Sequence, residues 1–160
     1  MEALAGLSAI VGISAAAIEW SRNIYEVAHE IKHAREEVEY FANEVFSFGS
    51  AILLAKESLD RQSEKQNAAA TIGRMKGLRK LIKAVIFQSK SINRRIKNTF
   101  TQLDTMSITF DILCRIKWYF HKTDVKWLSV QMNSVQTTMN LVVASVTLEL
   151  GGNGLSVQER

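Results

Sequence analysis

Apolar residues recur at alternating steps of three and four along four stretches of this 160-residue chain, which restricts the fold more than any other feature. This spacing keeps apolar side chains on one face of a helix that packs in a bundle. The chain has no proline and only eight glycines, so little interrupts long helices. The four sets are Ile10, Ile13, Ala17, Trp20, Ile24, Val27 and Ile31; Val38, Phe41, Val45, Phe48, Ile52, Ala55 and Leu59; Met75, Leu78, Ile82, Val85, Ser89, Ile92 and Ile96; and Val125, Leu128, Met132, Val135, Met139, Val142 and Val146.

These sets predict an all-α fold, an antiparallel helical bundle of four to five helices with a long apolar N-terminal helix. The first two helices are expected to separate at KHARE, residues 32–36. A short additional helix is expected over residues 108–120, followed by a break at HKTD, residues 121–124. Thr123 or Asp124 would then cap the last helix.

The end of the last helix is predicted from its composition. The segment VVASVTLEL, 142–150, is rich in β-branched residues, but the apolar seam runs through it, so we expect helix. The sequence GGNG, 151–154, is expected to stop this helix. Residues 1–150 would then form one helical bundle domain, and residues 151–160 a flexible tail or a linker to an absent C-terminal region.

Charge is distributed unevenly along the chain, although the formal net charge is only +4. Ten acidic and five basic residues lie between Glu19 and Glu64, whereas ten basic residues and no acidic one lie between Lys65 and Leu103. A basic block of this kind permits an anionic partner such as lipid, nucleic acid or an acidic protein. The alternative is a basic surface that faces water or the acidic segment.

A column of lysines stands out within this basic block. Lysines recur every seven residues, with further cations and Phe87 alongside, on the side of the third helix opposite its apolar seam. The predicted anionic-lipid contacts are Lys76, Lys80, Lys83, Lys90, Arg94 and Lys97. Nucleic acid fits less well, because the stretch has neither a recognisable binding module nor an array of stacking aromatic residues.

The stretch HEIKH, 29–33, has the H-E-x-x-H spacing of helical zinc sites in metalloproteases. However, the apolar seam places His29 and His33 on the opposite, solvent-facing side of the helix. In the extended form of this motif, Glu36 and Glu39 occupy the places of a glycine and of the third histidine. We therefore expect no metal site here.

No other enzyme signature is present. The chain lacks a phosphate-binding loop, a G-x-S-x-G nucleophile elbow and a dinucleotide-binding glycine motif. A single cysteine, Cys114, gives no indication of an oxidising compartment. These observations predict a non-enzymatic, cytoplasmic protein without cofactors or a small-molecule substrate. A secretory signal with a cleavage site near SAAAIEW is the alternative, although the positive start typical of such signals is missing.

The segment Ala3–Ile18 contains no charged residue and is shorter than the roughly 20 apolar residues of a membrane span. It is either a central core helix or a helix that packs in the bundle at rest and enters a bilayer when released. The candidate membrane-active residues are Leu4, Leu7, Ile10, Val11, Ile13 and Ile18, and Ser8, Gly12 and Ala16 form a candidate small-residue packing ridge. Exposing all six apolar side chains would cost about 9–18 kcal/mol, so release requires lipid insertion or self-assembly.

Two segments carry a resemblance to a known family. MEALAGLSAIVGISAAAIEWSRNIYEVAHEIKHAREEVEYFANEVFSFGSAI, 1–52, resembles the start of the fungal N-terminal domain of STAND, or NLR-like, proteins, which azaphilone pigment-cluster proteins also carry. DILCRIKWYFHKTDVKWLSVQMNSVQTTMNLVV, 111–143, resembles the late segment of the same domain. This domain belongs to the HeLo-like group, and the resemblance covers about residues 1–148.

The resemblance implies a helical signalling domain, similar in architecture to the four-helix domain of mixed lineage kinase domain-like protein. In the HeLo-like group, the N-terminal helix acts in membrane targeting and permeabilisation during regulated fungal cell death, a form of innate immunity. By position, Ala3–Ile18 would be this helix. The expected partners are an anionic membrane, and a second copy or another helical domain. The alternative is a protein–protein interaction adaptor whose first helix stays in the core.

Overall fold

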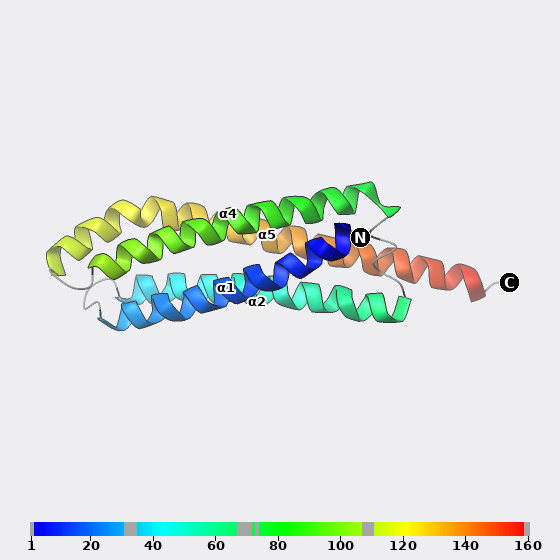
Figure 1. Ribbon diagram of the computed structural model, residues 1–160, viewed down its shortest axis with the longest axis horizontal. Coiled ribbons are helices and arrows are strands. Elements are labelled where there is room, and N and C mark those ends of the chain that lie inside the picture. Colours follow the sequence, from blue (N-terminus) through cyan, green and yellow to red (C-terminus); the bar gives the residue numbers. More distant parts are fainter. Residues whose placement is uncertain (1, 31–34, 67–71, 73, 107–110, 159–160) are drawn as a thin grey trace.

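The computed structural model describes the backbone of residues 2–30, 35–66, 72, 74–106 and 111–158, and the side chains of 8–29, 35–62, 72, 74–101 and 122–151. Four long helices make up this structure (Figure 1): α1 (Glu2–Glu30), α2 (Arg35–Gln66), α4 (Lys76–Met106) and α5 (Asp111–Gln158). The described residues contain no strand, so the predicted all-α fold is confirmed for them. The expected joint near KHARE is also confirmed, because one helix ends and the next begins on either side of residues 31–34.

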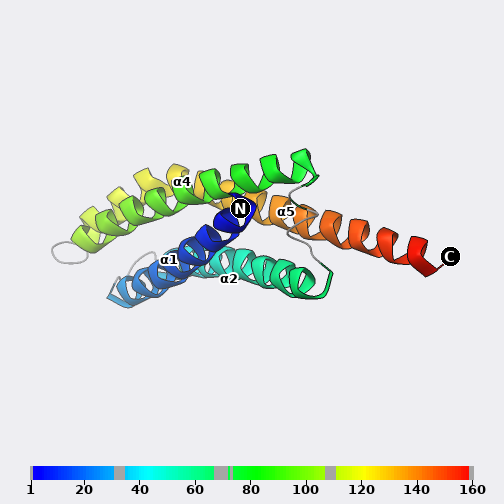
Figure 2. The same ribbon diagram turned by 45° about the vertical axis from the view of Figure 1, so that its right-hand side comes forward.

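The helices form two antiparallel hairpins, α1 with α2 and α4 with α5, stacked so that α1 lies beside α4 and α2 beside α5 (Figures 1 and 2). Three side-chain hydrogen bonds between described residues of α2 and α5 each join residues that are 85 positions apart: Glu37 with Lys122, Glu44 with Ser129, and Gln62 with Thr147. A constant difference means that α2 and α5 run in the same direction. The expected antiparallel arrangement therefore holds within each hairpin, whereas neighbours across the hairpins are parallel.

The diagonal pairs of this bundle are α1 with α5 and α2 with α4. Within the described part of the chain, no close backbone contact joins either pair. The chain therefore passes between diagonally opposite corners from Gln66 to Lys76. Ile72, in this connection, is buried among the core residues.

The core consists of the apolar seams that the sequence predicts. Trp20, Met75 and Val125 are partly buried, Ile31 lies outside the described residues, and every other member of the four sets is buried. Burial of each large side chain contributes roughly 1.5–3 kcal/mol. Alternating steps of three and four keep the seam facing the neighbouring helices along the whole bundle.

The predicted break at HKTD is wrong, because α5 is continuous through residues 121–124. These four residues include neither glycine nor proline, so nothing in them prevents a helix. Lys122 also forms an ion pair with Glu37 of α2 at 3.2 Å, which holds this turn against the bundle. The short helix expected over 108–120 is consequently the first part of α5 from Asp111 onward.

The predicted helix end at GGNG is wrong as well, since α5 continues to Gln158. Figure 1 shows this end of α5 extending beyond the other helices. Leu150, directly before the glycines, is only 8% exposed, so packing continues up to this point. Glycine within a helix costs about 1 kcal/mol but does not forbid it. The preceding segment VVASVTLEL is helical, as expected.

The N-terminal helix differs from the long apolar helix that the sequence predicts. α1 is 29 residues long, but charged residues follow Ile18 on its exposed side. Over the described residues, every helix is too short or too polar to span a bilayer. Its contacts with α2 and α4 place α1 at one corner of the bundle, so it is not a central core helix.

Candidate functional site

The residues predicted as the membrane-active helix do not share one environment. They are Leu4, Leu7, Ile10, Val11, Ile13 and Ile18. Ile10 and Ile13 are buried, Ile18 is partly buried, and Val11 is 41% exposed. Leu4 and Leu7 belong to α1, but their side chains lie outside the described part. The structure therefore assigns two of the six to the core and leaves Val11 at the surface.

The exposed side of α1 changes character at Ile18. The exposed residues of the first half are Ser8, Val11, Gly12 and Ala15, and those of the second half are Glu19, Arg22, Tyr25, Glu26 and His29. A helix at a bundle corner usually carries charged residues on its solvent side. Between Ser8 and Ile18, α1 carries none, either on its buried or on its exposed side.

The residues of the predicted small-residue ridge are largely exposed in this bundle. Ser8 and Gly12 are exposed, Ala16 is partly buried, and a Cβ atom added at Gly12 would have no neighbour within 4 Å. The close approach of α1 to α2 is at Gly49 instead. A Cβ atom there would lie 3.0 Å from the carbonyl oxygen of Ser14 and 3.1 Å from the Cβ of Ala17.

The contact between α1 and α4 is partly polar. The Asn93 side-chain amide donates a hydrogen bond to the carbonyl oxygen of Ile13 at 2.9 Å, and Trp20 contacts Phe100 with ring centroids 5.2 Å apart. Within the described residues, the Asn93 Oδ1 atom is buried without a hydrogen-bond partner. An unsatisfied buried polar atom costs about 1–3 kcal/mol, so this interface is held less tightly than a fully apolar one.

The basic face of α4 is exposed, as the sequence predicts. It comprises Lys76, Lys80, Lys83, Lys90, Arg94 and Lys97, with Phe87 at its centre. The Phe87 ring is 76% exposed, the joint highest value among the exposed large apolar residues of the described part. Among the described residues, none forms an ion pair with Lys76, Lys80, Lys90, Arg94 or Lys97. The structure thus brings the predicted lipid-contact residues together on one surface.

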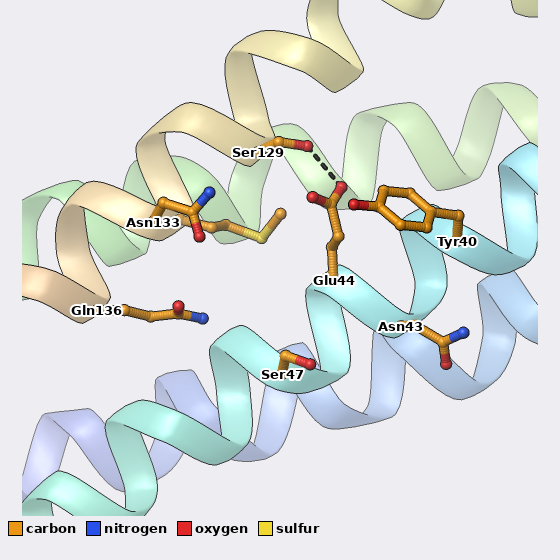
Figure 3. A pocket seen from close by; sticks show the side chains of 8 residues that line it. Tyr40, Asn43, Glu44, Ser47, Ser129, Asn133 and Gln136 are labelled. Carbon is orange, nitrogen blue, oxygen red and sulfur yellow. Dashed lines mark hydrogen bonds between the residues drawn. The ribbon is translucent and has the colours of Figure 1, made fainter.

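A groove between α2 and α5 is a feature that the sequence did not indicate. Its polar section is about 240 Å³ and is lined by Tyr40, Asn43, Glu44, Ser47, Ser129, Met132, Asn133 and Gln136. Figure 3 shows Glu44 pointing from α2 toward Ser129 on α5, whose hydroxyl donates a hydrogen bond to the carboxylate at 2.6 Å. The side chains of this section can donate and accept hydrogen bonds, but they include no histidine or cysteine to act as a base or nucleophile.

The groove continues into a more open section of about 600 Å³ near the start of α2. Tyr40 and Val130 are exposed there, and Glu36, Glu37, Lys122 and Lys126 surround them. An apolar floor with charged edges suits a protein segment better than a small substrate. In the sequence, Tyr40 and Val130 are apolar or aromatic residues outside the apolar seams, and this position was the signal for their exposure. That both line the same groove depends on the parallel pairing of α2 and α5, which the sequence does not reveal.

His29 of the HEIKH stretch is exposed on α1, in agreement with its predicted position. Its Nδ1 donates to the Tyr25 carbonyl oxygen at 3.1 Å, and the same atom lies 3.8 Å from the Glu39 carboxylate. Glu39 also accepts a 2.7 Å hydrogen bond from Arg35, which raises the pKa of that guanidinium. His33 lies outside the described residues. Those residues include no group of three or more His, Cys, Asp or Glu side chains placed to hold a metal ion.

Comparison with protein-family models, with curated proteins and with solved structures finds no match for this chain. The resemblance to the HeLo-like group therefore stays a prediction from the sequence. What the described structure adds is a helical bundle in which the uncharged stretch 3–18 of α1 lies at one corner and a basic face lies on the adjoining helix α4.

Proposed function

We propose that this chain is a non-enzymatic signalling or effector domain of the fungal HeLo-like kind, acting by self-assembly and membrane targeting through the first half of α1. One observation carries the proposal: α1 has no charge on its exposed side from Ser8 to Ile18. When such a surface contacts lipid or a second copy of the chain, no charged side chain on it has to lose its hydration, so the free-energy cost of the contact is low.

The first half of α1 does not leave the bundle unaided. Exposing Ile10 and Ile13 to water would cost about 3–6 kcal/mol, a large fraction of the stability of a domain. Val11 adds little to this cost, because it is already exposed. Release is therefore coupled to a step that covers these side chains again, either lipid insertion or assembly with other copies.

Dye release from anionic liposomes tests the proposal. Gly12→Glu with Ala15→Glu places two acids on the exposed side of α1, where they leave the core intact. We expect this variant to lose most of its dye release, because a charged face is costly to bring into lipid. Ser134→Glu with Asn140→Glu adds the same charge to exposed positions of α5 and should behave like wild type.

A chain lacking residues 1–18 is a second, more drastic variant and should also be inactive. Oligomerised wild-type protein that neither binds nor permeabilises these liposomes would rule out membrane action. Release that is unchanged in the Gly12→Glu, Ala15→Glu variant would show that the first half of α1 is not the membrane-active part.

The groove between α2 and α5 favours a second candidate, a protein–protein interaction adaptor without membrane activity. In this alternative α1 stays packed, and the exposed Tyr40 and Val130 contact another helical domain. Amide hydrogen exchange of Leu4–Ile18 separates the two functions. Slow exchange throughout this segment that does not change when liposomes are added supports the adaptor, whereas exchange that becomes faster or slower on lipid addition supports membrane action.

A further inference from the structure

We propose that the basic face of α4 docks the intact bundle onto an anionic phospholipid bilayer, with Phe87 as its apolar anchor and α1 still packed. This inference rests on the membrane partner in the proposed function. It adds which surface makes the first contact and how the molecule is oriented. In this arrangement docking precedes any movement of α1.

The geometry of the face suits an extended anionic surface. Its cations are spaced three, four or seven residues apart, so they lie along one side of α4. From Lys76 to Lys97 this side extends about 30 Å along the helix axis. No acidic residue occurs in the sequence between Lys65 and Leu103, so the helix itself supplies no counter-charge along this length.

Phe87 lies in the middle of this side, with Lys83 four residues before it and Lys90 three residues after it. An exposed aromatic ring surrounded by cations is typical of helices that lie in the membrane interface, where the ring enters the lipid and the cations meet the headgroups. Within α4 the ring has no partner in the core, since it points away from the apolar seam. A bilayer would cover it.

The orientation follows from the contacts of α4 with its neighbours. Asn93 and Phe100 face α1, and Lys90 and Lys97 each precede one of them by three residues on the same side of the helix. The lysines therefore border the seam between α4 and α1. On the α5 side, Arg95 instead lies over the Trp127 ring at 4.0 Å. Docking thus brings α1 next to the bilayer.

The position of charged residues along the length of α1 decides which half of the helix approaches the lipid more readily. Gly12 and Ala15 are exposed and uncharged, whereas Glu19, Arg22 and Glu26 follow further along the helix. The uncharged half therefore approaches the bilayer more readily than the charged half. This is the half that the proposed function assigns to membrane action.

A nucleic acid is the other polyanion that a basic helix binds, but the face fits it less well. Binding to single strands usually uses several aromatic rings on which bases stack, and this side of α4 presents Phe87 alone. Apolar anchoring is also of no use against a phosphate backbone, whereas it adds directly to the affinity for a bilayer.

Co-sedimentation with vesicles of equal parts phosphatidylserine and phosphatidylcholine tests the docking. We expect Phe87→Ser and Lys90→Glu each to weaken binding about tenfold, and the double variant to abolish it. Leu54→Ser and Arg61→Glu are matched controls on exposed positions of α2, diagonally opposite α4, and should bind like wild type. Wild type should bind poorly to phosphatidylcholine alone and more weakly as salt is raised.

Three outcomes decide between the hypotheses. Vesicle binding that is unchanged in the Phe87→Ser, Lys90→Glu double variant overturns the docking surface, even if dye release is intact. Binding that depends on both residues but produces no dye release supports the docking surface and counts against the proposed function. Tighter, Lys90-dependent binding to a duplex oligonucleotide than to the anionic vesicles overturns the assignment to lipid. Unchanged helical circular dichroism confirms that each variant is folded.

Discussion

Gly49 allows α1 and α2 to approach each other more closely than any side chain would permit. A Cβ atom at this position would lie 3.0 Å from the backbone oxygen of Ser14 and 3.0 Å from Cγ1 of Ile18. The side chain of Ile18 can adjust, but the backbone of Ser14 is held within a helix. The glycine therefore serves packing, although glycine within a helix is unfavourable by itself.

Alanine substitutions at two glycines separate packing from helix propensity. Gly49→Ala should lower the free energy of unfolding by about 1–3 kcal/mol, because the added methyl group overpacks the interface. Gly12→Ala should raise it by about 0.5–1 kcal/mol, because this position is open and alanine favours the helix. Urea denaturation measures both. Equal effects of the two substitutions would contradict the close approach at Gly49.

Ser89 occupies a core position of α4, where its hydroxyl is buried without a partner among the described residues. Ser89→Ala should therefore raise the free energy of unfolding by about 1 kcal/mol more than Ser91→Ala, which changes an exposed serine of the same helix. The Ser91→Ala control measures the part of the change in stability that comes from replacing serine by alanine in a helix. Thermal or urea unfolding checks the difference, and a loss of stability in Ser89→Ala would show that the hydroxyl is satisfied.

The continuity of α5 is the main feature at the level of helices. Local signals at HKTD and GGNG favour a start and an end of helix, yet the helix runs through both. A capping residue contributes only about 1 kcal/mol, whereas the apolar seam of α5 buries many large side chains. Tertiary packing therefore outweighs these local preferences.

Thr123→Pro tests this continuity. In the middle of a helix, proline should lower the free energy of unfolding by about 3 kcal/mol or more, because it removes a backbone hydrogen bond and clashes with the preceding turn. If Thr123 instead preceded a capped helix start, proline would be tolerated. Thr123→Ala, at the same exposed position, is the control and should have little effect. Chemical denaturation of the two variants gives the answer.

At the level of the whole molecule, two helical hairpins are stacked so that α1 runs parallel to α4 and α2 runs parallel to α5. This arrangement puts α2 and α4 on diagonally opposite corners. The basic face of α4 and the groove between α2 and α5 consequently point in different directions. The proposed membrane contact and the protein contact of the alternative function therefore lie on separate surfaces.

Cysteine cross-linking tests the parallel stacking. With Cys114 replaced by serine, the pairs Glu44→Cys with Ser129→Cys and Gln62→Cys with Thr147→Cys should form intramolecular links with a short thiol reagent. The mixed pair Glu44→Cys with Thr147→Cys should not, because its residues lie about 27 Å apart along the bundle. Mass spectrometry detects the links. Efficient linking of the mixed pair would contradict the parallel register.

Much of the fold could be predicted because it depends on a regular pattern. The seams in α2 and α4, for example, are buried as expected from Val38 to Leu59 and from Leu78 to Ile96. The exposure of the basic face followed from the same pattern, since it lies opposite a seam. The surface position of Val11 did not, because an apolar residue beside two seam residues reads as buried unless the neighbouring helices are known.

The sequence by itself determined that the chain forms helices, which side of each is buried, and which residues carry the positive charge. These properties depend on spacing along one helix. Only the tertiary structure decided which helices are neighbours, in which direction they run, and that α1 lies at a corner beside the basic face. Similar apolar seams can pair in several ways. The choice depends on side-chain fit between helices, such as the close approach at Gly49, which no single helix specifies.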